Sequence, residues 1–123
     1  MSKPILGSFD LICGEDFSLV FVWKDTSGDV IDLTTWTEML LTIRPGTDTS
    51  QSSDSNAWIT KTITNTGWTT DGKVTFQITR ADSVGQTKQT VMQCEIWGVD
   101  AQSKYHYGGL YQTIVYPSLT KRT

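Results

Sequence analysis

The chain of 123 residues has only one histidine and two cysteines, and it contains no long apolar run. A single histidine, His106, cannot form a histidine-rich metal site, and Cys13 and Cys94 lack the close spacing of zinc ligands. No window approaches the roughly 18 apolar residues of a membrane span. Residues 1–7 lack the apolar core of a signal peptide. We therefore expect a protein without metal or other cofactor, made and used in the cytoplasm.

Basic charge is scarce as well. Ten Lys and Arg residues stand against thirteen Asp and Glu residues, which gives a net charge of −3. A nucleic-acid surface needs clustered cations to neutralise phosphates, and an anionic membrane needs a basic amphipathic face. The sequence therefore predicts neither nucleic acid nor a membrane among the partners.

The two cysteines allow two interpretations. An immunoglobulin-type domain would pair Cys13 with Cys94 across two sheets, close to a tryptophan. Alternatively, both are buried thiols in a reducing compartment, where disulfides are rare. The lack of a secretory signal favours the thiols.

Candidate catalytic groups are few. Cys94 and His106 are a conceivable nucleophilic pair, but Cys94 falls in an apolar strand pattern, where burial raises the thiol pKa and makes it inert. Asp25, Asp29 and Asp32 have the wrong spacing for a calcium loop and are better explained as turn residues. We therefore expect no catalytic residues, and the sequence does not predict an enzyme.

The sequence is rich in short segments that alternate between apolar and polar residues. Such alternation predicts half-buried strands, because successive side chains point to opposite faces. The apolar positions that share a parity are Phe17, Leu19, Phe21 and Trp23, then Met39, Leu41 and Ile43, then Val74, Phe76 and Ile78. Residues 30–34 predict a further short strand after the turn at 24–29.

Two segments in the C-terminal third of the chain allow more specific predictions about their strands. Residues 89–100 are apolar on both parities, which indicates a strand that is central or covered on both sides. Residues 105–116 predict the last strand, and Gly108 and Gly109 within it suggest a bulge. Residues 79–85 predict one helical turn that Thr79 begins and Gly85 ends.

Seven or eight short strands separated by turns predict an all-β fold, an immunoglobulin-like antiparallel β-sandwich with one short helical turn. A jelly roll or a small barrel is the alternative. We expect an N-terminal arm at 1–9, lying along an edge of its own sheet or of a neighbour's, a sandwich at 10–117 and a C-terminal tail at 118–123. The polar run at 46–56 predicts an exposed loop.

Five tryptophans make the chain rich in aromatic surface. Trp23 and Trp97 lie within predicted strands, which favours core or inter-sheet packing. Trp36, Trp58 and Trp68 lie near predicted corners, where exposed rings can stack on sugars or anchor a protein interface. Core packing is the better interpretation for most of them, and an interface is better than a sugar site for any that are exposed.

Across most of its length the chain resembles a family of small phage virion proteins with an immunoglobulin-like sandwich. The family includes the N-terminal domain of siphophage baseplate upper proteins and tail-fibre-associated proteins. The matching residues are 14–17 (GEDF), 23–25 (WKD), 28–34 (GDVIDLT), 41–44 (LTIR), 74–79 (VTFQIT), 81–82 (AD) and 111–122 (YQTIVYPSLTKR). The chain has Gln112 where the family usually has glycine, and Lys121 separates the terminal threonine and arginine.

The resemblance implies a virion structural protein of the tail, baseplate or fibre attachment, present in symmetric copies and made in the bacterial host cytoplasm. It would contact other virion proteins and copies of itself, and exposed strand edges would accept strands from neighbours. The residues expected at such contacts are Pro4, Ile5, Leu6, Phe9, Trp36, Leu119, Lys121 and Arg122. The alternatives are a capsid decoration or cement protein, and a carbohydrate-binding module that would use Trp36, Trp58, Trp68, Tyr105 and Tyr107 to bind a glycan.

Overall fold

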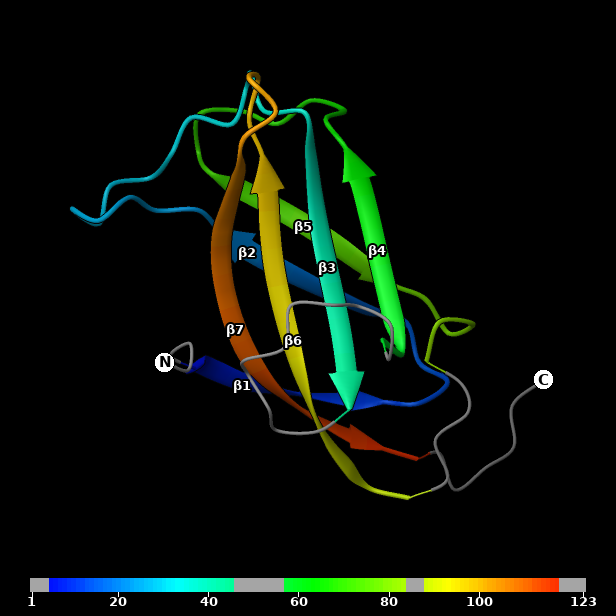
Figure 1. The fold of residues 1–123 in the computed structure, drawn as a ribbon. Coiled ribbons are helices and arrows are strands. Elements are labelled where there is room, and N and C mark those ends of the chain that lie inside the picture. The colour runs from blue at the N-terminus through cyan, green and yellow to red at the C-terminus, as the bar shows by residue number, and fades with distance from the viewer. Residues whose placement is uncertain (1–4, 46–56, 84–87, 118–123) are drawn as a thin grey trace.

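The computed structural model describes residues 5–45, 57–83 and 88–117, and these fold into seven strands without a helix. The strands are β1 (Ile5–Ile12), β2 (Phe17–Val22), β3 (Glu38–Pro45), β4 (Ile59–Thr64), β5 (Lys73–Ile78), β6 (Thr90–Val99) and β7 (Tyr105–Tyr116). One sheet has the order β1-β7-β6-β3-β4 and the other contains β2 and β5 (Figure 1). The predicted all-β sandwich is confirmed.

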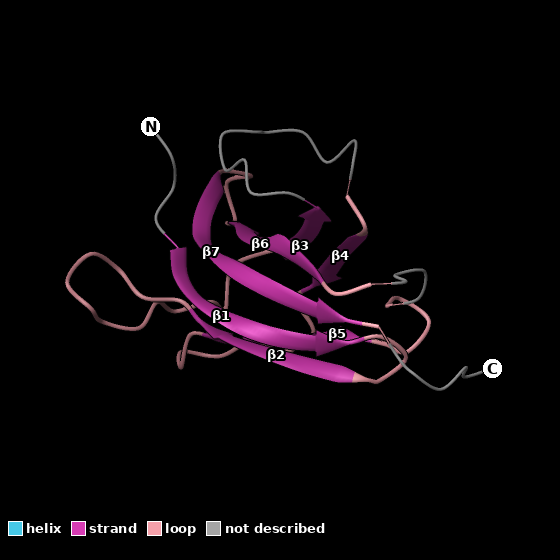
Figure 2. Ribbon diagram, turned by 90° about the horizontal axis from the view of Figure 1, so that it is seen from below, coloured by secondary structure: helices cyan, strands magenta, loops and turns pink. Residues whose placement is uncertain are grey.

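The larger sheet is built around β6, which pairs antiparallel with β3 on one side and β7 on the other. This is the strand that the sequence predicts to be central. The edge strand β1 pairs with β7 in parallel, from Ile5 opposite Leu110 to Ile12 opposite Tyr116. Figure 2 shows β1 lying between β7 and β2. The described residues of the predicted arm, 5–9, thus belong to a strand at the edge of the chain's own sheet.

The core lies between the two sheets, where the alternating apolar residues meet. Residues that are at most 1% exposed include Met39, Leu41 and Ile43 of β3, Val74, Phe76 and Ile78 of β5, and Met92, Cys94 and Ile96 of β6. Cys13 and Cys94 are both buried thiols and are not joined in a disulfide, as the sequence favoured. The predicted facing of these strands is therefore confirmed.

Three details differ from the sequence-based expectations or refine them. Residues 30–34 form no strand. Only a single bridge joins Lys24 to Val30, and the Asp32 carboxylate accepts hydrogen bonds from the N–H and the hydroxyl of Thr34. Residues 80–83 form a hydrogen-bonded turn and no helix. Thr79 nevertheless donates its N–H to the Asp82 carboxylate at 2.7 Å, as the first residue of a capping box does. The predicted bulge is present, since the register shifts at Gly108. The expectations for Gly85, the loop at 46–56 and the tail at 118–123 fall outside the described residues.

The corner before β3 is held by the side chain of Asn65. Its Nδ2 lies 3.2 Å, 3.2 Å and 2.9 Å from the carbonyl oxygens of Leu33, Thr34 and Trp36. Its Oδ1 accepts hydrogen bonds from the N–H groups of Gly67 and Trp68 at 3.0 Å each. One amide therefore fastens the corner that carries Trp36 to the turn that follows β4.

Candidate functional site

One side of the sandwich, between β1 and β2, is not closed by main-chain hydrogen bonds. The two strands follow each other in sequence, yet β1 pairs with β7 and β2 pairs with β5. A cavity of about 740 Å³ opens here, and residues of β1, β2 and β7 line it together with the corner at Trp36. We call this surface the open flank; the residues used below to describe it are Leu6, Val20, Phe21, Trp23, Trp36, His106 and Tyr111.

Part of the rim of the open flank is apolar and exposed, and Lys24, Asp25 and Thr26 form an exposed polar part beside it. Leu6 is 57% exposed and Val20 is 55% exposed, and both line the cavity. Leu6 lies over Gly109, where an added Cβ would come within 2.4 Å of the leucine Cδ1 atom. Two large aliphatic side chains left in water beside one cavity are typical of a contact surface.

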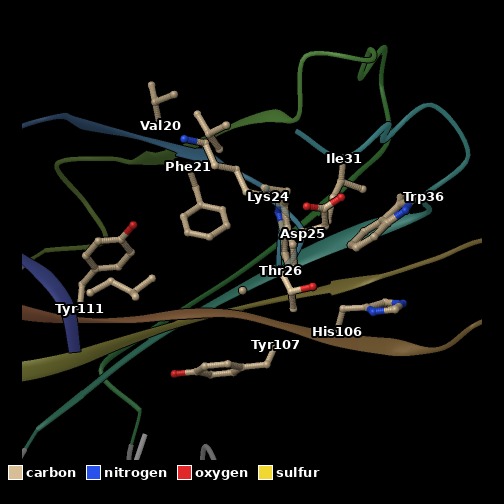
Figure 3. A pocket seen from close by; sticks show the side chains of 14 residues that line it. Val20, Phe21, Lys24, Asp25, Thr26, Ile31, Trp36, His106, Tyr107 and Tyr111 are labelled. Carbon is tan, nitrogen blue, oxygen red and sulfur yellow. The ribbon is translucent and has the colours of Figure 1, made fainter. Parts of the chain in front are cut away.

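The inner wall of the open flank is aromatic. The rings of Phe21 and Trp23 are 5.3 Å apart, and those of Trp23 and Trp36 are 5.0 Å apart. Tyr111 packs edge-on against Phe21 at 6.2 Å, and Figure 3 shows this pair at the opposite end of the cavity from Trp36. Trp23 is 3% exposed and its Nε1 is buried without a hydrogen-bond partner in the described part of the chain. The wall is therefore rigid and largely apolar.

A histidine and an aspartate lie at the Trp36 end of the open flank. The His106 ring stacks on Trp36 with 4.9 Å between centroids, and its Nε2 lies 2.8 Å from Asp100 Oδ2. The hydrogen bond with His106 is the main cause of the lowered pKa of Asp100, and the N–H groups of Lys104 and Gln102 add to it. Asp100 thus stays ionised and holds the imidazole against the indole.

The free edge of β2 borders the cavity. Trp23 N donates to Gly72 O at 2.8 Å, which directs the Trp23 main chain toward the β5 side. Because main-chain groups alternate along an antiparallel ladder, those of Val20 and Val22 point to the opposite, outer edge. No strand of the described ranges pairs with that edge. The open flank therefore combines exposed apolar side chains with main-chain donors and acceptors that another strand can use.

The residues expected at contacts are only partly brought together. Leu6 and Trp36 line the open flank, although Trp36 is just 9% exposed and packs mostly within the chain. Phe9 lies within β1, and its ring stacks on that of Phe17, the first residue of β2, with 5.3 Å between ring centroids. Ile5 lies in β1, and its side chain is outside what the structure describes. Pro4, Leu119, Lys121 and Arg122 lie outside the described residues.

Sequence reasoning missed Val20 as a site residue. The signal was present, because Val20 and Val22 make the polar parity of β2 apolar as well. The same reasoning correctly identified β6 as a central strand. In β2 the second apolar face is instead left exposed at Val20, since the smaller sheet has no further layer over it.

Four of the five tryptophans pack in or against the core, among them the buried Trp36, and Trp97 does not. Trp23 is buried, and Trp58 and Trp68 are half-buried and pack against the core. Trp97 differs from the prediction of core packing: it is half-buried on the face of the larger sheet turned away from β2 and β5, beside Tyr107. Its position follows from parity, because Ile96 next to it points into the core.

The described residues offer little reactive chemistry. Burial raises the pKa of the Cys94 thiol to about 12, and the charge of Glu95 adds to the effect. Within residues 5–45, 57–83 and 88–117, no group of three or more His, Cys, Asp or Glu is placed to hold a metal ion. The part of the chain that the structure describes contains no helix able to span a membrane.

Comparison with protein-family models and with curated proteins found no match to the chain. The features that bear on function are therefore the open flank, the aromatic residues around Trp97 and the sequence resemblance.

Proposed function

We propose that this chain is a non-catalytic structural protein of a bacteriophage virion. In this proposal it is a component of the tail, baseplate or fibre attachment and acts through protein–protein contacts in a symmetric assembly. The sequence resemblance, which spans most of the chain, supports the virion role. The single structural observation that supports a role in assembly is the free edge of β2 beside the exposed Leu6 and Val20.

The open flank suits an extended segment of a neighbouring chain. Such a segment would pair with the outward main-chain groups of Val20 and Val22, as in other cases of strand addition. Its alternate side chains would enter the cavity against Phe21 and Tyr111 and cover Leu6. Main-chain pairing supplies affinity, and the aromatic wall selects side chains that fit, so the arrangement specifies both register and partner.

The energy available at one such contact is modest. Fully burying an aliphatic side chain contributes about 1.5–3 kcal/mol, so covering the half-exposed Leu6 and Val20 contributes about 1 kcal/mol each. Strand pairing adds to this, and repeated copies in a particle convert weak contacts into high avidity. A structural role in a many-copy assembly therefore fits the surface better than a tight one-to-one complex.

Site-specific photo-crosslinking tests the role of the open flank. A benzophenone amino acid is placed at position 20 in protein expressed during phage infection or prophage induction in the source organism. Position 91 is the matched control, because Val91 is also an exposed valine on a strand, at 37%, and does not line the cavity. We expect a crosslink to another virion protein from position 20 and none from position 91.

The identity of the crosslinked partner also separates the two virion alternatives. A tail or baseplate protein supports the proposal as stated, and a capsid protein supports a decoration or cement protein instead. Equal crosslinking from both positions, or none from position 20 in purified particles, would contradict assembly through the open flank.

A further inference from the structure

The outer face of the larger sheet, turned away from β2 and β5, carries an ordered set of side chains. Strand register places Thr62, Leu40, Trp97 and Tyr107 side by side across β4, β3, β6 and β7. The next row on this face is Thr60, Thr42, Glu95 and the buried Leu110, and the row after it contains Arg44, Gln93 and Gln112. The outer face therefore changes from aromatic to hydroxyl and carboxylate, and then to guanidinium and amide.

A hollow of about 520 Å³ lies on this face. Leu40, Trp97 and Tyr105 form its apolar part, and Thr42, Thr60, Arg44 and Glu95 form its polar part. Its volume lies within the range of about 300–1,000 Å³ that is usual for small-molecule sites. A few polar groups beside an aromatic surface are also the usual composition of such sites.

Neighbouring side chains hold the aromatic part of the hollow in place before any ligand binds. Trp97 Nε1 donates a hydrogen bond to Glu95 Oε1 at 2.6 Å, which fixes the plane of the indole. Tyr107 packs edge-on against Trp97 with ring centroids 5.1 Å apart. Figure 3 shows the Tyr107 ring on the other side of the β7 ribbon from Phe21, although Tyr107 also lines the cavity of the open flank. Tyr105, at the edge of the hollow, is 63% exposed and offers its ring to a ligand.

The polar part can take several hydrogen bonds from one ligand. A guanidinium has five N–H donors and a carboxylate has about four acceptor sites, so Arg44 and Glu95 can bind hydroxyls in addition to their present partners.

We propose that this hollow is a binding site for a neutral carbohydrate. A sugar ring has an apolar face of C–H groups, which packs on an aromatic ring, and a rim of hydroxyls, which donate and accept hydrogen bonds. The Tyr105 and Trp97 rings meet the first requirement, and Thr42, Glu95 and Arg44 meet the second. Opposite charges on Arg44 and Glu95 leave no excess charge to select an ionic ligand.

The experiment titrates the whole chain with a panel of neutral mono- and disaccharides built from glucose, galactose, mannose, rhamnose and N-acetylglucosamine. Two-dimensional ¹H–¹⁵N NMR follows the backbone amides and the Trp97 indole N–H. We expect at least one sugar to shift the signals of Trp97, Thr42 and Thr60 together. No shift with any sugar at 20 mM, or shifts confined to other residues, would overturn the proposal.

Two variants test the assignment without endangering the fold. Tyr105→Ala removes an exposed ring, and Thr42→Val replaces a hydroxyl by a methyl of similar shape. Each should weaken sugar binding by about fivefold to tenfold. The control is Val91→Ala on the same strand as Trp97, outside the hollow, which should leave the affinity unchanged. Equal affinity for all three variants would place the sugar elsewhere and overturn the proposal. The result does not depend on assembly through the open flank.

Discussion

Replacing Asn65 gives the sharpest test of how the corner behind the open flank is held. The side-chain amide both donates and accepts hydrogen bonds. Its Nδ2 group donates to the carbonyls of Leu33, Thr34 and Trp36, and its Oδ1 accepts from the N–H groups of Gly67 and Trp68. Asn65→Ala removes both sets. Asn65→Asp keeps the acceptor and removes the donors, so the two variants separate the two halves of the network.

The expected magnitude follows from counting these bonds. A typical intramolecular hydrogen bond contributes about 0.5–1.5 kcal/mol net, and water replaces part of the loss at the exposed contacts. Four bonds, two donated and two accepted, give about 2–3 kcal/mol for Asn65→Ala. Asn65→Asp should cost at least as much, because its carboxylate would face three carbonyl oxygens without a proton to donate.

Urea unfolding followed by tryptophan fluorescence measures both variants, since Trp36 and Trp68 lie on the two segments that Asn65 joins. We expect a lower unfolding midpoint with an unchanged slope, and a melting temperature reduced by about 10 °C. Thr66→Ala is the control, because the neighbouring Thr66 is exposed. The reasoning is refuted if Asn65→Ala lies within about 0.5 kcal/mol of the parent chain, or if Asn65→Asp is the milder change.

Three further predictions concern the core, the thiol and the open flank. Gly98→Ala adds a Cβ 2.5 Å from one tryptophan ring and 2.9 Å from another, so calorimetry should show a loss of about 1–3 kcal/mol, whereas Gly7→Ala, whose nearest neighbour is at 3.7 Å, should be neutral. In a variant without the other cysteine, Cys94 should react with iodoacetamide at pH 8 about a thousandfold more slowly than an ordinary thiol until urea unfolds the chain; fast alkylation of the folded protein would refute burial. The pKa of Asp100 should lie below the ordinary aspartate value, so its contribution to stability is present above that ordinary value and disappears as the pH falls through the lowered pKa; carbon NMR should show this pKa rising in His106→Ala, and an unchanged value would contradict the hydrogen bond as the main cause.

The sequence predicted those parts of the fold that depend on local alternation. The inward residues of β3 and β5 follow from a period of two, and the central place of β6 follows from apolar residues on both parities. The bulge at Gly108 was also visible, because paired glycines interrupt a long strand. Each of these features is determined by the side chains of one segment.

Pairing between distant segments could not be predicted in the same way. The N-terminal segment contains Gly7 and alternates weakly, so nothing in it specifies a parallel partner about a hundred residues later. Residues 30–34 alternate like a strand, but Asp32 bonds Thr34 and ends the extended conformation. In both cases contacts outside the segment decide its structure.

The residues of the candidate sites likewise divide into those predictable from one segment and those that depend on the pairing of distant strands. Leu6 was expected at a contact surface and lines the open flank. Val20 had an apolar signal in the sequence, but only the strand order shows that it lies on the uncovered edge of a two-stranded sheet. Trp97 was assigned to the core, but its parity directs it outward to Tyr107. Strand order, which the sequence does not state, decides which apolar face is left in water.

Immunogold labelling of phage particles tests the proposed virion role most directly. Particles are purified from infected or prophage-induced cells of the source organism and labelled with an antibody against this chain, with particles of an unrelated phage as the control. The account predicts label at the tail, at its tip or along the fibres, and label over the capsid would assign the chain to decoration instead. Particles without label, from cells that express the chain, would contradict the virion role.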